Sequence, residues 1–332
     1  MSLPEDGSVI CIGDMKMLLS IIVGTHNRAD DLRETIRSLG GVNIPSGCAC
    51  ELLIVDNASQ DHTPTVIRET RLTNMTVQAL HEKKVGLSNA RNLGISRANG
   101  EIILFTDDDL RYPADWLEAM SGPLIRREAH IVAGAMRLAS HLERAWMGPM
   151  HRIWLAAPLE DSPASKGNLV GANMALRREV LSKVPRFDPE LGPGALGFGD
   201  DSLFGQQLLE AGYQFATVPL RTEHHFLPER LTRSSFLSHA KKLGQSGAYT
   251  AHHWEHKEMR TARIHLIKKI MQLAVWRTAH RAETQQEEGM HPSEMHHLRS
   301  LHIYGNALIE RRRPRNYEWH GLVKNIPDGH GD

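Results

Sequence analysis

Three consecutive carboxylates, Asp107, Asp108 and Asp109, lie at the end of an apolar segment that starts at Glu101. Adjacent carboxylates repel one another, and a bound divalent cation would remove this conflict. Oxygen ligands select hard cations, and an added histidine shifts the preference from Mg²⁺ towards Mn²⁺. Because side chains alternate along an extended segment, Asp107 and Asp109 are expected to share a face. The triple predicts a metal that holds a diphosphate, and the alternative is a solvated acidic turn.

The elements that would position these carboxylates follow from the hydrophobic pattern. Continuous apolar runs predict strands buried on both faces, as in a parallel sheet, at 18–24, 51–56, 76–80 and 101–107. Helical patterns separate them, one over 32–39, one with Thr63 as N-cap and one with Ser88 as N-cap. Further strands are predicted at 131–136, 168–176 and 214–218. This alternation indicates a doubly wound α/β sheet.

Ligands of open α/β sheets bind outside the carboxyl ends of the strands. Four polar clusters fall at such ends and are expected to converge on one crevice: Thr25, Asn27 and Arg28; Asp56 and Asn57; Asp107 to Asp109; and Asp200 with Asp201. Arg91, near a predicted helix start, could bind the same phosphates, and the alternative is a surface arginine. Asp200 and Asp201 could instead cap a helix over 202–211. A GxGxxG after the first strand and a GxxxxGK[ST] motif are both absent, so neither a dinucleotide fold nor a P-loop is supported.

Composition excludes several classes of protein. The 332 residues contain 39 Lys plus Arg and 39 Asp plus Glu, so no overall basic field argues for nucleic acid as a partner. The three cysteines form no CxxC pair, which fits a reducing compartment. Neither a signal peptide nor an apolar run long enough to cross a membrane is visible. The sequence therefore predicts a cytoplasmic protein.

With these residues in hand, the chain resembles the family 2 glycosyltransferases, which have the GT-A fold, a Rossmann-like, mainly parallel sheet between helices. The resemblance covers roughly residues 18–230. It rests on five motifs in the family's order and spacing: SIIVGTHNRADDL, ELLIVDNASQDHT, GLSNARNLGISRANGEIILFTDDDL, GANMALRREVLSKVPRFDPELG and GDDSLFGQQLLEAGY. Each motif alone is weak, but all five in register are specific.

The resemblance implies a role for each matching residue. Thr25, Asn27 and Arg28 match the first nucleotide-binding turn, and Asp56 matches the aspartate that holds the base, usually uracil. The three aspartates match the DxD motif, in which Asp109 would bind the metal and Asp107 would approach the ribose, with Asp108 as an alternative ligand. Asp201 matches the general base. His224 matches a histidine that completes the metal shell, and His225 is its rival.

These roles imply a metal-dependent inverting glycosyltransferase that uses Mn²⁺ or Mg²⁺ and a nucleotide-sugar, with a UDP-sugar as the first candidate. Asp201 would take the proton of an acceptor hydroxyl as it attacks the anomeric carbon. A saccharide or lipid-linked acceptor is expected, in polysaccharide, glycolipid or other glycoconjugate synthesis. The alternatives are a sugar nucleotidyltransferase, which would need an early glycine-rich phosphate loop, and a non-catalytic nucleotide-sugar-binding scaffold, which would be expected to lack Asp201 or the DxD.

The predicted organisation is an N-terminal tail, 1–17, a GT-A catalytic domain, 18–231, and a C-terminal helical extension, 232–332. No pattern assigns the acceptor-binding segment 138–166. His252 and His256, one helical turn apart, are read as a solvated helix face because no third metal ligand is evident. The segments 263–276 and 311–315 could contact anionic lipid at the inner face of the plasma membrane, although packing on the catalytic domain explains the apolar positions equally well. The sequence leaves the oligomeric state open.

Overall fold

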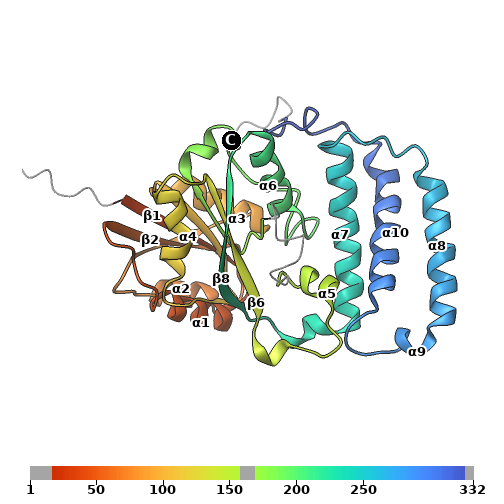
Figure 1. The fold of residues 1–332 in the computed structure, drawn as a ribbon, viewed down its shortest axis with the longest axis horizontal. Helices are drawn as coiled ribbons and strands as arrows, with labels where there is room; N and C mark the ends of the chain where they lie inside the picture. Colours follow the sequence, from red (N-terminus) through yellow and green to blue (C-terminus); the bar gives the residue numbers. More distant parts are fainter. Residues whose placement is uncertain (1–16, 158–168, 326–332) are drawn as a thin grey trace, which may run out of the picture.

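The computed structural model describes residues 17–157 and 169–325. Within them the strands form one eight-stranded mixed sheet in the order β3-β2-β1-β4-β7-β6-β8-β5. The first four strands in this order are parallel, β7 is antiparallel to both of its neighbours, and β6 and β8 are parallel. The predicted α/β fold class, a mainly parallel sheet between helices with a helical extension, is confirmed (Figure 1). The strands are β1 (Met17–Thr25), β2 (Cys48–Asp56), β3 (Thr76–His81), β4 (Ile102–Asp107), β5 (Leu110–Arg111), β6 (Ile131–Leu138), β7 (Asn173–Arg177) and β8 (Phe215–His224).

Helices cover both faces of the sheet because the central strands are apolar on both sides. On β1, Ile21 faces the core built with α1 (Ala29–Leu39), α2 (Thr63–Glu69) and α4 (Trp116–Ile125). The neighbouring Ile22 faces the opposite core, which contains side chains from α3 (Leu87–Arg97) and α6 (Asp200–Glu210). Alternate side chains of one strand therefore enter different cores, as strand geometry requires.

Beyond the sheet, helices form a second layer in the part of the chain that was predicted to be a helical extension. The long α7 (Arg233–His253) lies nearest the sheet, α10 (Pro292–Glu310) packs beside it, and α8 (Ala262–Ala279) packs on the far side of α10 (Figure 1). Phe236 of α7 and Met295 of α10 share a core with Trp154 of the short helix α5 (Pro149–Trp154). Another short helix, α9 (Arg281–Thr284), follows α8. Among the described residues no helix is long and apolar enough to cross a membrane.

Several predicted element boundaries are wrong. The helix over 87–97 has Gly86 at its N-cap, and the hydroxyl of Ser88, predicted to be the cap, donates to the carbonyl of Leu191. Thr63 is the first residue of α2 and follows His62 at the N-cap. The strand predicted at 168–176 begins only at Asn173, and residue 168 lies outside the described residues. The predicted tail 1–17 also lies outside them except for Met17, which begins β1, as do residues 158–166 of the predicted acceptor segment.

Candidate active site

The carboxyl ends of β1, β2 and β4 lie next to each other, as the sequence predicted. In the parallel register Thr25 pairs with Asp56, and Gly24 pairs with Asp107. Side chains that follow these strands therefore share one edge of the sheet. Further contacts tie in the other clusters, since the Thr25 hydroxyl donates to Asp108 and Arg91 bridges Asp107 and Asp200. The predicted convergence of the four polar clusters is confirmed.

The acidic turn itself is buried. Asp108 is 6% exposed and Asp109 is 5% exposed, so the alternative of a solvated acidic turn is wrong. Arg28 Nη1 lies 2.7 Å from Asp109 Oδ2 and 3.5 Å from Asp108 Oδ1, and Thr25 Oγ1 donates to Asp108 Oδ2 at 2.6 Å. Burial, followed by repulsion from Asp109, raises the pKa of Asp108 well above its ordinary value. Arg28 alone therefore does not stabilise Asp108 and Asp109 together in their charged forms.

The expectation that Asp107 and Asp109 act from one face of a strand does not hold. Strand β4 ends at Asp107, and Asp108 and Asp109 form a turn, so the alternation of an extended segment stops there. Asp107 Oδ1 lies 2.9 Å from Arg91 Nη2, whereas Asp108 and Asp109 both contact Arg28. The three aspartates are thus divided between two arginines.

Asp109 and His224 fit a shared divalent cation. Asp109 Oδ1 is buried without a hydrogen-bond partner in the described structure, and His224 Nε2 lies 3.5 Å from it. The other ring nitrogen, Nδ1, donates to the carbonyl of Leu155 at 3.0 Å, so the lone pair is on Nε2, which lies 3.5 Å from Asp109 Oδ1 and also 3.5 Å from Arg230 Nη1. Within the described residues no group of three or more His, Cys, Asp or Glu side chains could hold a metal ion by itself. The remaining ligands would have to be diphosphate oxygens and water, as is usual for Mg²⁺.

The rival histidine is directed elsewhere. His225 donates its backbone N–H to the carbonyl of Asp109 at 2.7 Å, but its ring contacts Glu223 at 3.2 Å. Consecutive residues at a strand end point to opposite sides, so only one of the two rings can face the acidic turn. This geometry supports His224 as the ligand.

Arg91 lies at the centre of a buried charge network. The residue is 3% exposed, so the alternative of a surface arginine is wrong. Its Nη1 donates to Asp200 at 2.8 Å and its Nη2 donates to Asp107 at 2.9 Å, while its guanidinium lies over the ring of Phe187. A Cβ on Gly171 would lie 2.5 Å from Arg91 Nη1, so a larger residue at that position would displace the guanidinium. Both terminal nitrogens of Arg91 already bind carboxylates, and its contact with phosphate stays a prediction.

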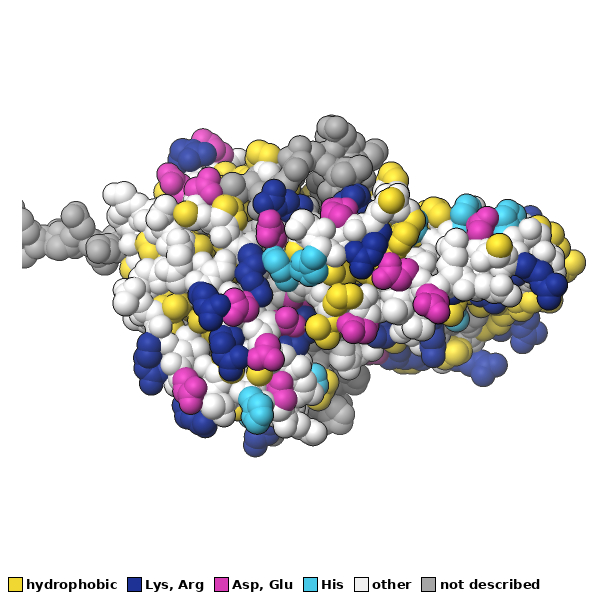
Figure 2. Space-filling view, turned by 90° about the horizontal axis from the view of Figure 1, so that it is seen from below, with side chains coloured by type: hydrophobic (Ala, Val, Ile, Leu, Met, Phe, Trp, Pro, Cys, Tyr) yellow, Lys and Arg dark blue, Asp and Glu magenta, His cyan; other side chains and the backbone are white. Residues whose placement is uncertain are grey.

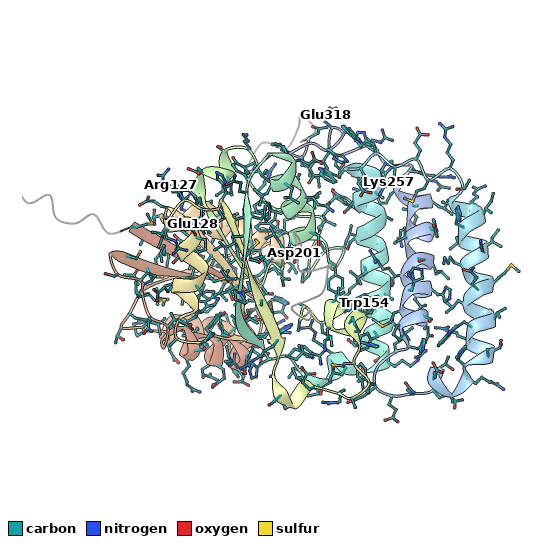
Figure 3. The ribbon with its side chains drawn as sticks, viewed as in Figure 1. Arg127, Glu128, Trp154, Asp201, Lys257 and Glu318 are labelled. Atoms are coloured by element: carbon teal, nitrogen blue, oxygen red, sulfur yellow. The ribbon has the colours of Figure 1, made fainter. Side chains whose placement is uncertain are left out.

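Asp200 and Asp201 have different environments at the start of α6. Gly199, with φ 87°, is the N-cap, so the helix begins at Asp200 and the alternative that Asp200 or Asp201 is its N-cap is wrong. Asp200 is buried against Arg91, and burial raises its pKa to about 6. Asp201 is half-buried, and its Oδ2 accepts the N–H of Gly171 at 2.9 Å. Figure 3 shows Asp201 on the side of the sheet nearer the helical extension.

Two predicted residues lie where β1 and β2 end, at the carboxyl edge of the sheet. Asp56 is buried and accepts the backbone N–H of Ser59 at 3.0 Å, while the His81 ring contacts its other oxygen. Asn27 has φ 53° and joins the turn after β1 to the loop after β2, since its Oδ1 accepts the N–H of Gln60. Asparagine tolerates this left-handed conformation better than most residues.

Sequence reasoning missed Arg230. Its Nη1 lies 3.8 Å from Asp109 Oδ2, and its guanidinium lies over the ring of Phe226. Burial lowers the pKa of Arg230, and the nearby charge of Arg28 adds to this effect. Two arginines therefore face one buried turn, and guanidinium groups are suited to bind phosphate oxygens. The only available signal was the position of Arg230 shortly after His224.

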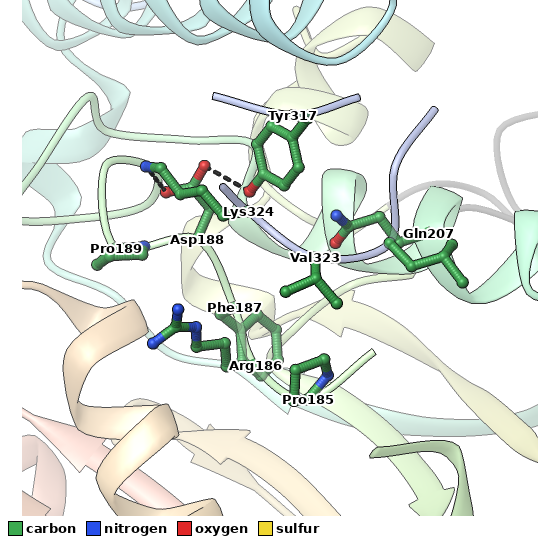
Figure 4. Close-up of a pocket in the computed structure, with 10 residues that line it drawn as sticks. Pro185, Arg186, Phe187, Asp188, Pro189, Gln207, Tyr317, Val323 and Lys324 are labelled. Carbon is green, nitrogen blue, oxygen red and sulfur yellow. Dashed lines mark hydrogen bonds and ion pairs between the residues drawn. The ribbon is translucent and has the colours of Figure 1, made fainter. Parts of the chain in front are cut away.

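The segment after α10, which contains Tyr317 and Lys324, contacts the loop that precedes α6. Asp188 is buried and accepts hydrogen bonds from Tyr317 at 2.7 Å and Lys324 at 2.8 Å (Figure 4). It also accepts one from Tyr249 at 2.6 Å. Asp188 directly follows Phe187, the residue on which Arg91 packs. His252 is also buried, and its Nε2 binds the carbonyl of Arg313. The reading of His252 as part of a solvated helix face is therefore wrong.

This sheet order, with an acidic turn at the carboxyl ends of its parallel strands, defines a GT-A fold. A mannosyltransferase, PcManGT from Pyrobaculum calidifontis, solved in complex with GDP-Man and Mn²⁺, matches with a TM-score of 0.52. The match covers 89% of this chain and 74% of that chain at 19% sequence identity, which shows the fold alone.

Sequence comparison then gives the family. The model for glycosyl transferase family 2 matches residues 20–184. Glycosyltransferase AglE from Haloferax volcanii is 23% identical over 197 residues, which are 59% of this chain and 62% of AglE. Succinoglycan biosynthesis protein ExoM from Rhizobium meliloti is 27% identical over 237 residues, which are 69% of this chain and 72% of ExoM. The chain belongs to glycosyl transferase family 2.

Proposed function

We propose that this glycosyltransferase moves a sugar from a nucleoside diphosphate donor to an acceptor hydroxyl with inversion, and that the donor is a UDP-sugar. The observation that carries the proposal is the buried carboxylate of Asp109, whose Oδ1 has no hydrogen-bond partner in the described structure and lies 3.5 Å from His224 Nε2. A carboxylate and an imidazole in this arrangement suit Mn²⁺ or Mg²⁺. The match with a structure that holds GDP-Man and Mn²⁺ supports this class of donor, although it points to a different base.

The donor would lie across the carboxyl edge of the sheet. Asp56, Thr25, Asn27 and Arg28 surround the place proposed for the nucleoside, between the ends of β1 and β2. Arg28 and Arg230 both face Asp109 and are suited to bind diphosphate oxygens. A metal held by Asp109 and His224 would neutralise charge on the leaving diphosphate. Asp107 would approach the ribose, and Asp108 stays an alternative metal ligand.

Asp201 is proposed as the general base. The N–H of Gly171 holds its Oδ2 and the N–H of Ser202 holds its Oδ1 at 2.7 Å, so the carboxylate is fixed in one orientation. Oδ1 also accepts the hydroxyl of Ser202 at 3.3 Å, so Oδ2 is the oxygen that keeps a lone pair for the proton of an acceptor hydroxyl. The hydroxyl oxygen would attack the anomeric carbon as the bond to the diphosphate breaks, and a single displacement inverts the configuration. A saccharide or lipid-linked acceptor is proposed.

Calorimetry tests the donor site directly. Binding of UDP, GDP, dTDP and CDP would be measured with Mn²⁺ and with EDTA, for the wild type, Asp109→Asn and Asp115→Asn. Asp115 is an exposed aspartate a few residues further along the chain and serves as the matched control. We expect Mn²⁺-dependent binding of one nucleotide, lost in Asp109→Asn and kept in Asp115→Asn. If the folded wild type binds no diphosphate under either condition, a non-catalytic scaffold becomes the better interpretation.

A further inference from the structure

The outermost helix, α8, exposes its apolar side chains. Ile264, Ile267, Met271 and Val275 are 60–68% exposed, although they are spaced three or four residues apart and so form one helical stripe. The buried residues of the helix, Ala262 and Leu273, lie on the opposite face, where α8 packs on α10. A surface helix normally has the reverse pattern, with polar residues outward. An apolar stripe of this length on a surface marks a docking site.

The charge along α8 is of one sign. The helix has four cations, Arg263, Lys268, Lys269 and Arg277, and no acidic residue over 262–279. Arg277 binds the buried Glu294 of α10 at 2.9 Å, whereas Arg263 and Lys268 are exposed and form no ion pair with the described residues. Helical geometry places these two cations on either side of the apolar stripe. Figure 2 shows hydrophobic side chains beside basic ones along the outer edge of this lobe.

A shallow, open hollow accompanies the apolar stripe. A groove of about 740 Å³ runs along it, lined by Ile264, Ile267, Met271, Val275 and Trp276 and bounded by His297 of α10. Trp276 is half-buried at the border between the apolar face and α10. Tryptophan, isoleucine and methionine flanked by lysine and arginine make up the face that an interfacial helix presents to a bilayer.

We propose that the exposed face of α8 docks on an anionic lipid bilayer, with the apolar stripe entering the headgroup region and Arg263 and Lys268 binding lipid phosphates. Charge favours this occupant over a second copy of the chain, because two α8 faces would bring like charges together around the contact. In Figure 1 α8 is the helix furthest from the sheet, so lipid bound there would leave the carboxyl edge open to a donor. The proposal does not depend on the proposed donor or mechanism.

Vesicle flotation tests the proposal on the full chain. Vesicles of phosphatidylcholine alone would be compared with an equal mixture of phosphatidylcholine and phosphatidylglycerol, at about 0.1 M and about 0.5 M salt. We expect the wild type to float with the anionic vesicles at low salt and to be released at high salt. In Arg263→Glu/Lys268→Glu both flanking cations are lost, and each loss is expected to lower the affinity for anionic vesicles roughly fivefold. Repulsion between the new glutamates and the lipid phosphates lowers the affinity further.

The apolar stripe has its own variant and control. Ile267→Glu/Met271→Glu is expected to lower vesicle binding at least about tenfold, because the two side chains proposed to enter the headgroup region would then carry charge into it. Leu209→Glu, which changes an exposed leucine of α6, is the matched control and keeps wild-type binding. All variants change exposed residues, so their melting temperatures are expected to match the wild type.

Two results would overturn the proposal. One is that flotation shows no binding of the wild type to anionic vesicles, or equal binding of the wild type and Ile267→Glu/Met271→Glu. The other is a concentration-dependent dimer, seen by sedimentation velocity, that this variant dissociates, which would assign the stripe to a second copy. Nucleotide calorimetry on the same variants separates this test from that of the donor site, since unchanged nucleotide binding is expected in every case.

Discussion

Replacing Arg91 with methionine removes the cation that two buried carboxylates share. Arg91 is buried in α3 and bridges Asp107 and Asp200 at 2.9 Å and 2.8 Å. Methionine keeps most of the apolar volume, so the loss is mainly electrostatic. Breaking a buried ion pair by removing one partner costs about 3–5 kcal/mol of unfolding free energy. We expect a loss in this range near neutral pH.

The pH dependence identifies the source of that loss. Burial raises the pKa of Asp200 from 3.8 to about 6, so the folded protein binds this proton more tightly than the unfolded chain does. This group therefore lowers stability as pH rises from about 4 to about 6, by roughly 3 kcal/mol over that window. Arg91 opposes the shift, and without it the pKa of Asp200 would rise further. Arg91→Met should therefore lose most unfolding free energy, relative to the wild type, above pH 6. Near pH 5 the loss should be small, because Asp200 is protonated in both the variant and the wild type.

Urea unfolding followed by circular dichroism, near pH 5 and near pH 8, measures both effects. Arg97→Met is the matched control, because Arg97 is exposed in the last turn of the same helix. Its loss is expected to stay within about 0.5 kcal/mol at either pH. The reasoning is refuted if Arg91→Met behaves like Arg97→Met, or if its loss is the same at both pH values.

Three further results are expected. Asp201→Asn should lower the rate of donor hydrolysis or transfer by about 10²–10⁴ while nucleotide binding stays within about twofold, and an equal loss of binding would contradict its role as base. His224→Ala should weaken Mn²⁺-dependent nucleotide binding by at least about tenfold in calorimetry, whereas His225→Ala should leave it unchanged. A loss in His225→Ala alone would contradict the choice of His224 as the ligand. Tyr317→Phe removes a donor to the buried Asp188 and should lower the unfolding free energy by about 1–3 kcal/mol, which urea unfolding would measure against the wild type.

Much of the fold could be predicted because its signals are local. Apolar runs of strand length, separated by amphipathic helices, determined the class of sheet, and parallel strands bring their carboxyl ends to one edge. This is why Thr25, Asp56 and Asp107 could be grouped before their register was known. The exact caps were less predictable. Serine is a common N-cap residue, but the hydroxyl of Ser88 donates to the carbonyl of Leu191, more than a hundred positions away in the chain.

The sequence by itself determined which chemical groups the site contains and which edge of the sheet holds them. Only the tertiary structure decided how those groups pair. Arg91 was expected to bind phosphates because it lies near a helix start, yet its partners Asp107 and Asp200 lie 16 and 109 positions away. Arg230 reaches Asp109 only because β8 returns beside β5. The physical reason is that ion pairing depends on distances of a few ångströms, which are set by the register of strands and the rotation of helices rather than by residue type.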